Sequence, residues 1–133
     1  MLSHLYLFSD YMISKNNILI TGGSVRIGRE ICLAVAGNSN NIIIHYNKSS
    51  KQASNLKKSI EKLGSKCAIV KCDLNKKRNI ESLIRKSSKF FGPINCLINN
   101  ASVFENDNIN NFTLSSWDKH MSVNLYSPIK LSS

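Results

Sequence analysis

The sequence is poor in the features that mark special classes of protein. It has two prolines and six glycines among 133 residues, and no long apolar run. We therefore expect neither a collagen-like chain nor a membrane-spanning helix. The four cysteines form no Cys-x-x-Cys pair and have no histidine at ligand spacing, which predicts free thiols and no metal site. No basic leader or cleavage pattern is recognisable, so a cytoplasmic location is expected.

Acidic residues are also scarce. Eight Asp plus Glu stand against eighteen Lys plus Arg, for a formal net charge of +10. Such a charge favours polyanions of any kind. The lysines are scattered among Asn and Ser instead of forming a basic stripe interleaved with aromatic residues, so we expect neither nucleic acid nor membrane as a partner. With 42% hydrophobic residues, the composition is that of one globular domain.

Short apolar runs alternate with amphipathic stretches from Asn17 onward. The pattern predicts strands at 17–21, 41–46, 66–72 and 94–99, and helices at 26–36, 50–63, 77–91 and from about 115, capped by Ser115 or Ser116. The apolar stripes expected on the first three helices are Ile27, Ile31 and Val35; Ala53, Leu56, Ile60 and Leu63; and Ile80, Leu83, Ile84 and Phe91. This order predicts an α/β fold, a Rossmann-like doubly wound parallel sheet with strand order 3-2-1-4.

The predicted sheet is incomplete. Each strand–helix unit takes roughly 26 residues, and six strands counted from Asn17 would need roughly 175. We therefore expect residues 15–133 to be a partial nucleotide-binding domain and residues 1–14 to be an N-terminal extension, with Met12 as an alternative start.

A glycine-containing loop, Thr21 to Gly28, joins the first strand to the first helix. Gly22 suits the sharp turn and Gly28 the close approach of helix to strand, with backbone N–H groups free for a pyrophosphate. The segment after the second strand, 45–50, contains no carboxylate that would bind the ribose of NAD and repel a 2′-phosphate. Lys48 and Ser49 can bind that phosphate, so NADP is the expected cofactor. His45 is expected to be a packed or hydrogen-bonded histidine.

Five motifs occur in order: TGGSVRIGRE at 21–30, HYNKS at 45–49, Asp73-Leu74, NNAS at 99–102 and NLYSP from Asn124. In these residues the chain resembles the short-chain dehydrogenase/reductase superfamily and is most similar to its pteridine reductase type, over roughly residues 16–130. The resemblance implies an NADPH-dependent reductase of pteridines or dihydrofolate. The alternatives are a reductase of 3-oxoacyl thioesters or sugars, or a non-catalytic dinucleotide-binding module.

The resemblance also implies roles for individual residues. Those expected at the NADP pyrophosphate are Gly22, Ser24, Arg26, Ile27 and Gly28; at the 2′-phosphate, Asn47, Lys48 and Ser49; at the adenine, Asp73 and Leu74; and along the nicotinamide ribose, Asn100, Ala101 and Ser102. Asn99 would tie the sheet together, and Asn124 would be the catalytic asparagine of a proton relay.

Two departures from the general superfamily pattern favour the pteridine reductase type. Arg26 replaces the middle glycine of the loop, and Ser102 replaces the glycine of the usual Asn-Asn-Ala-Gly. In the pteridine reductases the matching serine and a following aromatic contact the pterin, which implies that Ser102 and Phe104 bind a small-molecule substrate, with the ring of Phe104 stacked on it.

The catalytic Tyr-x-x-x-Lys pair of the superfamily has no good match. Tyr126 and Lys130 have the spacing, but they directly follow the motif asparagine, and Pro128 between them disfavours a regular helix. The expected pair would lie beyond Ser133, so we expect these residues alone to be inactive. The fourth strand is expected to have an unpaired edge. The resemblance also implies that full-length members of the family are usually homo-oligomers.

Overall fold

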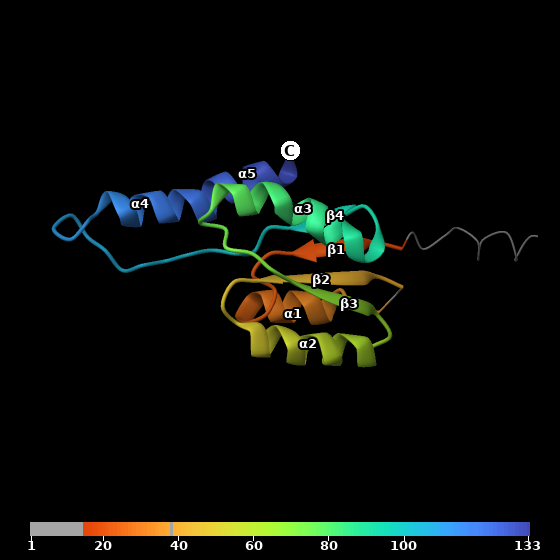
Figure 1. Ribbon diagram of the computed structural model, residues 1–133. Coiled ribbons are helices and arrows are strands. Elements are labelled where there is room, and N and C mark those ends of the chain that lie inside the picture. Colours follow the sequence, from red (N-terminus) through yellow and green to blue (C-terminus); the bar gives the residue numbers. More distant parts are fainter. Residues whose placement is uncertain (1–14, 38) are drawn as a thin grey trace, which may run out of the picture.

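A computed structural model describes residues 15–37 and 39–133, so the predicted extension at 1–14 lies outside the described residues. Four parallel strands form one sheet in the order β3-β2-β1-β4. Strand β1 therefore lies in the middle, and the chain crosses over it to reach β4 (Figure 1). The predicted fold class and strand order are confirmed.

The strands are short and the helices are placed between them as the sequence pattern predicts. The strands are β1 (Asn17–Ile20), β2 (Asn41–Tyr46), β3 (Lys66–Lys71) and β4 (Cys96–Ile98). The helices are α1 (Arg26–Ala34), α2 (Ser50–Lys62), α3 (Lys77–Phe91), α4 (Leu114–Met121), the π-helical turn η1 (Ser122–Tyr126) and α5 (Ser127–Ser132). Helix α3 and strand β2 keep their predicted bounds at both ends, while β4 is three residues shorter than predicted.

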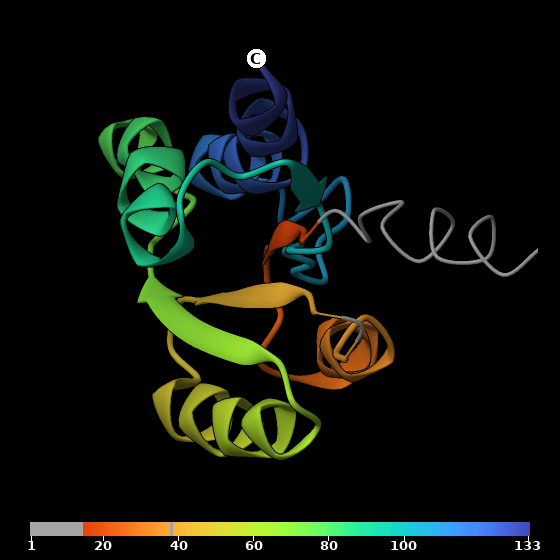
Figure 2. The same ribbon diagram turned by 90° about the vertical axis from the view of Figure 1, so that its right-hand side faces the viewer.

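Helices cover both faces of the sheet. Helices α1 and α2 pack on one face, where Ile18, Ile42 and Ile44 join residues of α2 in one core. Helices α3 and α5 pack on the other face, against Leu19 and Ile43 (Figure 2). Strands buried on both sides need apolar residues at consecutive positions, and this is why β1 and β2 read as apolar runs without alternation.

Two of the predicted apolar positions are wrong. Ile27 of α1 is 72% exposed and Leu63, just after α2, is 54% exposed. In α1 the face toward the sheet is instead formed by Gly28 and Cys32, which are buried. A small residue is required there because α1 lies close to the loop that precedes it.

Buried asparagines fasten the amino ends of the strands. The side chain of Asn17 donates to the carbonyl oxygens of Phe91 and Pro93, at 3.0 and 2.9 Å, and accepts from Nδ2 of Asn41 at 2.7 Å. Asn99, which was expected to tie the sheet, instead reaches Ser132 on the surface at 3.3 Å, so that prediction is wrong. The hydrogen bonds of Asn17 lie at the amino ends of the strands, at the opposite edge of the sheet from the carboxyl ends.

The last helical region continues further than predicted. The cap of α4 is Thr113, whose Oγ1 accepts from the backbone N–H of Ser116 at 3.1 Å, and not Ser115 or Ser116. The chain then stays helical through Pro128, but not as a regular α-helix, since the π-helical turn η1 precedes α5; the prediction that this proline disfavours a regular helix agrees with this. In a regular α-helix the ring of Pro128 would clash with the carbonyl of Asn124, and the π-helical turn η1 separates the two groups.

Within residues 15–37 and 39–133, none of the helices combines the length and the apolar character that crossing a membrane would require.

Candidate functional site

A pocket of ≈ 700 Å³ opens at the carboxyl ends of the strands. Its walls come from the loops that follow β1, β2, β3 and β4, and from α4 and η1. In a doubly wound sheet this is the edge at which ligands bind, next to the point where the strand order reverses. Every residue that the sequence predicts to bind the cofactor lines this one pocket.

The glycine loop lies tightly against the neighbouring strand ends. A Cβ atom at Gly28 would meet the carbonyl oxygen of Gly22 and would lie 2.6 Å from Nδ2 of Asn100. One at Gly22 would lie 2.9 Å from Cα of Ala101, and Gly22 also has a φ of 62°. Both glycines are therefore required for the loop and α1 to pack in this arrangement.

Thr21 and Asn100 join the ends of β1 and β4 below the pocket. Oγ1 of Thr21 accepts from the backbone N–H groups of Asn100 and Ala101, both at 3.0 Å. The Asn100 side chain donates to the carbonyl oxygens of Thr21 and Gly22, at 3.0 and 3.1 Å. The side chain of Asn100 thus holds the glycine loop, and the segments after β1 and β4 are held together where they line the pocket.

The backbone of Arg26 adopts the left-handed conformation. Its φ is 50°, at the position where the general superfamily pattern has glycine. Its side chain is exposed and lies at the rim of the pocket. The N–H groups of Arg26, Ile27 and Gly28 precede the first backbone hydrogen bond of α1, which Arg29 donates to Val25, and these three residues line the pocket.

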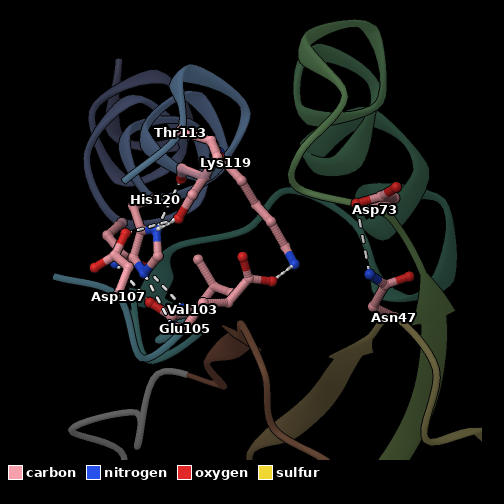
Figure 3. Close-up of polar contacts among 10 residues, drawn as sticks. Asn47, Asp73, Val103, Glu105, Asp107, Thr113, Lys119 and His120 are labelled. Atoms are coloured by element: carbon pink, nitrogen blue, oxygen red, sulfur yellow. Dashed lines mark hydrogen bonds and ion pairs between the residues drawn. The ribbon is translucent and has the colours of Figure 1, made fainter. Parts of the chain in front are cut away.

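The segment after β2 faces the segment after β3. Asn47 donates to Oδ1 of Asp73 at 3.5 Å, and the same oxygen accepts the backbone N–H of Asn75 at 3.0 Å (Figure 3). Lys48 is exposed at the rim, and Ser49 is partly buried. The charged side chains around the pocket are three cations, Arg26, Lys48 and Lys119, and one carboxylate, Asp73.

His45 is a hydrogen-bonded histidine, as predicted. Its side chain is 2% exposed, its Nδ1 lies 3.0 Å from the backbone nitrogen of Gly22, and its Nε2 lies 3.0 Å from the carbonyl oxygen of Cys72. Burial lowers the pKa of His45, and the hydrogen bond to Cys72 opposes this shift to a smaller extent. The neutral ring is favoured.

The segment that follows Ser102 is attached to α4 and η1. The side chain of Asn124 accepts from the backbone nitrogen of Val103 at 2.8 Å and donates to its carbonyl oxygen at 2.9 Å. Figure 3 shows Lys119 of α4 paired with the carboxylate of Glu105, whose backbone N–H donates to Nε2 of His120 at 3.0 Å. Asn124 therefore holds the wall of the pocket, while its expected role in a proton relay stays a prediction.

Two predicted site residues do not line the pocket. Asn124 acts from behind Val103, and the ring of Phe104 is 85% exposed and outside the pocket. Conversely, the pocket has lining residues outside the predicted binding set: Val25, His45, Tyr46, Asn75, Val103, Lys119 and Val123. The first five lie in or next to the predicted motifs, but nothing in the sequence marks Lys119 or Val123.

The cysteines are free thiols in the part of the chain that the structure describes. Burial raises the pKa of Cys32 and of Cys67 to about 12, and that of Cys72 to about 11. Such thiols stay protonated and unreactive near neutral pH. Among the described residues, no group of His, Cys, Asp and Glu side chains is arranged to hold a metal ion.

Solved structures resemble this fold over most of its length. The alternative dihydrofolate reductase 1 of Brucella canis, complexed with NADP, matches with a TM-score of 0.83 and 31% identity, over 91% of this chain and 49% of that one. A short-chain dehydrogenase of Burkholderia cenocepacia in complex with NADP matches with a TM-score of 0.83 and 28% identity, over 88% of this chain and 48% of that one.

A curated sequence relative gives the same result. The short-chain dehydrogenase/reductase FrzI of a Cladobotryum species is 29% identical over 110 residues, which are 83% of this chain and 43% of the relative. The chain thus spans about half the length of the relatives it matches. The family model described as short chain dehydrogenase matches residues 16–133. The chain therefore belongs to the short-chain dehydrogenase family.

Proposed function

We propose that this chain is the cofactor-binding part of an NADPH-dependent short-chain reductase. The observation that carries the proposal is the single pocket at the carboxyl ends of the strands, around which the glycine loop, the 45–49 segment and the segment after β4 meet. The resemblance to two structures determined with NADP supports the choice of cofactor.

The residues present fit a dinucleotide. Gly22 and Gly28 leave no room for side chains in the loop, and the first turn of α1 presents unpaired N–H groups to the pocket. A helix N-terminus of this kind binds pyrophosphate. Lys119 is paired with Glu105, which leaves Arg26 and Lys48 against the carboxylate of Asp73, and this excess of positive charge also favours an anionic ligand.

In this proposal each wall of the pocket has its own task. Lys48 and Ser49 bind the 2′-phosphate, and Asp73 and Leu74 contact the adenine. Asn100 and Ala101 support the nicotinamide ribose, with Asn124 holding the neighbouring Val103 in place. When bound, NADPH supplies a hydride to a C=O or C=N bond. Asn124 would then also take part in a proton relay.

For the substrate we propose a pterin or dihydrofolate. Arg26 at the rim and Ser102 in the lining are the sequence features that favour this class, and the Brucella canis relative carries the name of a dihydrofolate reductase. The exposed ring of Phe104 beside the pocket is free to stack on a planar heterocycle, which is a favourable contact for an aromatic side chain.

Calorimetric titration of the full chain with NADPH and NADH tests the choice of cofactor. We expect the chain to bind NADPH more tightly than NADH. Lys48→Glu should lower the affinity for NADPH by about tenfold or more, because a charged hydrogen bond to the 2′-phosphate is lost and a charge repulsion is added. The affinity of the same variant for NADH should change by less than about threefold. Lys51→Glu, an equal charge change on α2 away from the pocket, is the matched control and should leave both affinities unaltered.

Titration of dihydrobiopterin into the NADP-saturated chain tests the choice of substrate. Phe104→Leu should lower the affinity for dihydrobiopterin by about three- to tenfold if the ring of Phe104 stacks on the pterin. Phe112→Leu is the control, because Phe112 is also exposed but packs on Trp117 outside the pocket. Binding of a 3-oxoacyl thioester in place of the pterin would favour a different reductase. Equal affinities for NADPH and NADH would contradict the cofactor assignment.

A further inference from the structure

The hydrogen bonds of His45 define the protonation state of its ring. The carbonyl oxygen of Cys72 can only accept, so Nε2 must carry the hydrogen. The backbone N–H of Gly22 can only donate, so Nδ1 must present its lone pair. The arrangement therefore exists only for the neutral ring with its proton on Nε2.

These bonds connect three parts of the pocket. Gly22 begins the glycine loop, Cys72 directly precedes Asp73 and Leu74 at the end of β3, and His45 itself lies near the end of β2. The carbonyl oxygen of His45 also accepts the N–H of Gly23 at 3.0 Å. Two consecutive N–H groups of the loop are thus held by one residue, and the loop takes its orientation from it.

We infer that His45 is a positioning residue for the dinucleotide site, and that protonation of its ring weakens dinucleotide binding by releasing the glycine loop. The inference rests on the function proposed above. A proton on Nδ1 would face the N–H of Gly22, so an attractive contact would become a repulsive one. The loop would then turn away from the position in which its remaining N–H groups face a pyrophosphate.

The one carboxylate that lines the pocket with His45 is Asp73, and it accepts hydrogen bonds from Asn47 and Asn75 instead of pairing with the ring. The titratable and charged groups that line the pocket with His45 are Arg26, Tyr46, Lys48, Asp73 and Lys119, and Lys119 is paired with Glu105. The thiols of Cys72 and Cys32 adjoin the residues to which His45 is hydrogen-bonded. Among the described residues His45 forms no ion pair, and Arg26 and Lys48 are cations that none of the ion pairs there neutralises. Burial also lowers the pKa of His45, so the neutral ring persists at neutral pH and the coupling acts only below the ordinary pKa of 6.5.

The test is a pH series of calorimetric titrations on the full chain, from about pH 8 to about pH 5. NADH is the main probe, because the 2′-phosphate of NADPH itself titrates with a pKa of about 6. We expect the affinity of the wild-type chain for NADH to fall by about tenfold or more across the series, the change that about 1.4 kcal/mol produces.

Three variants separate positioning from simple packing. His45→Asn keeps an acceptor for Gly22 but has no proton to gain, so its affinity should be independent of pH. His45→Phe fills the space without an acceptor and should bind weakly at every pH. His120→Asn tests the other histidine among the described residues, which accepts the N–H of Glu105: a pH dependence that disappears in this variant and persists in His45→Asn would overturn the inference.

The outcomes are distinct. Wild-type affinity that stays constant across the series, or a dependence that His45→Asn retains, would overturn the role of His45 while leaving the proposed function intact. If neither NADH nor NADPH binds at any pH, the proposed function fails and the coupling fails with it. The wild-type series needs no variant, so the inference stays testable even if His45→Phe does not fold.

Discussion

Arg26 combines an unusual backbone conformation with a charge at the rim of the pocket. Its φ of 50° lies in the left-handed region, which costs an L-amino acid about 1 to 2 kcal/mol. Glycine would avoid this cost, but it would remove the guanidinium group from the rim. The backbone strain therefore follows from the position of residue 26 in the loop, whereas the positive charge follows from its being arginine.

Two substitutions of Arg26 separate these contributions. Arg26→Ala and Arg26→Gly both remove the charge, but only the glycine relieves the backbone. We expect Arg26→Gly to have a free energy of unfolding about 1 kcal/mol above that of Arg26→Ala, measured by urea denaturation. Equal stabilities would show that residue 26 does not occupy the left-handed region in solution.

Helix α4 and the turn η1 form one wall of the pocket, and α5 continues the same helical region. Thr113 caps α4 through the N–H of Ser116, and the π-helical turn η1 accommodates Pro128 further on. Between them, Asn124 and His120 hold the backbone of Val103 and Glu105. Loss of the cap would therefore loosen the wall from its first turn.

We predict that Thr113→Ala lowers the free energy of unfolding by about 1 kcal/mol, because one N–H group of the first turn loses its acceptor. The measurement is chemical denaturation followed by circular dichroism. Ser115→Ala is the control: Ser115 is exposed in the first turn of α4 and was one of the predicted caps. A larger loss for Ser115→Ala than for Thr113→Ala would contradict the capping found here.

At the scale of the whole molecule, buried neutral groups determine the pH range of stability. His45 has a lowered pKa in the folded chain, whereas Cys32 and Cys67 have pKa values raised to about 12. For His45 the stabilisation is complete above its ordinary pKa of 6.5 and is lost as the pH falls below it. For the thiols it is complete below 9.0 and is lost as the pH rises above that value.

Thermal denaturation over a range of pH should therefore show a plateau between 6.5 and 9.0. Outside it, each titrating group should reduce the stability by up to about 1.4 kcal/mol per pH unit. His45→Asn should lose most of the decline just below the plateau. A melting temperature that stays constant down to about pH 5 in the wild type would contradict a buried neutral His45.

Much of the fold could be predicted because its signals are local. The bounds of α3 follow from helical spacing and a terminal Gly92-Pro93, and β2 from an unbroken apolar run. The prediction of buried positions failed where packing against a segment distant in the sequence determines which face of a helix is buried. Ile27 has the right spacing for a buried face, but α1 turns Gly28 and Cys32 toward the sheet because the glycine loop packs closely there.

The candidate site divides in the same way. By itself the sequence determined the order of strands and helices and the motifs that follow each strand, because propensity, periodicity and turn residues act over a few positions. Only the tertiary structure decided that His45 holds Gly22 and Cys72, that Asn124 holds Val103 and that Lys119 lines the pocket. The three hydrogen bonds join residues that are 21 to 27 positions apart in the sequence. Parallel strands bring such residues together only once the sheet and its crossover helices have formed.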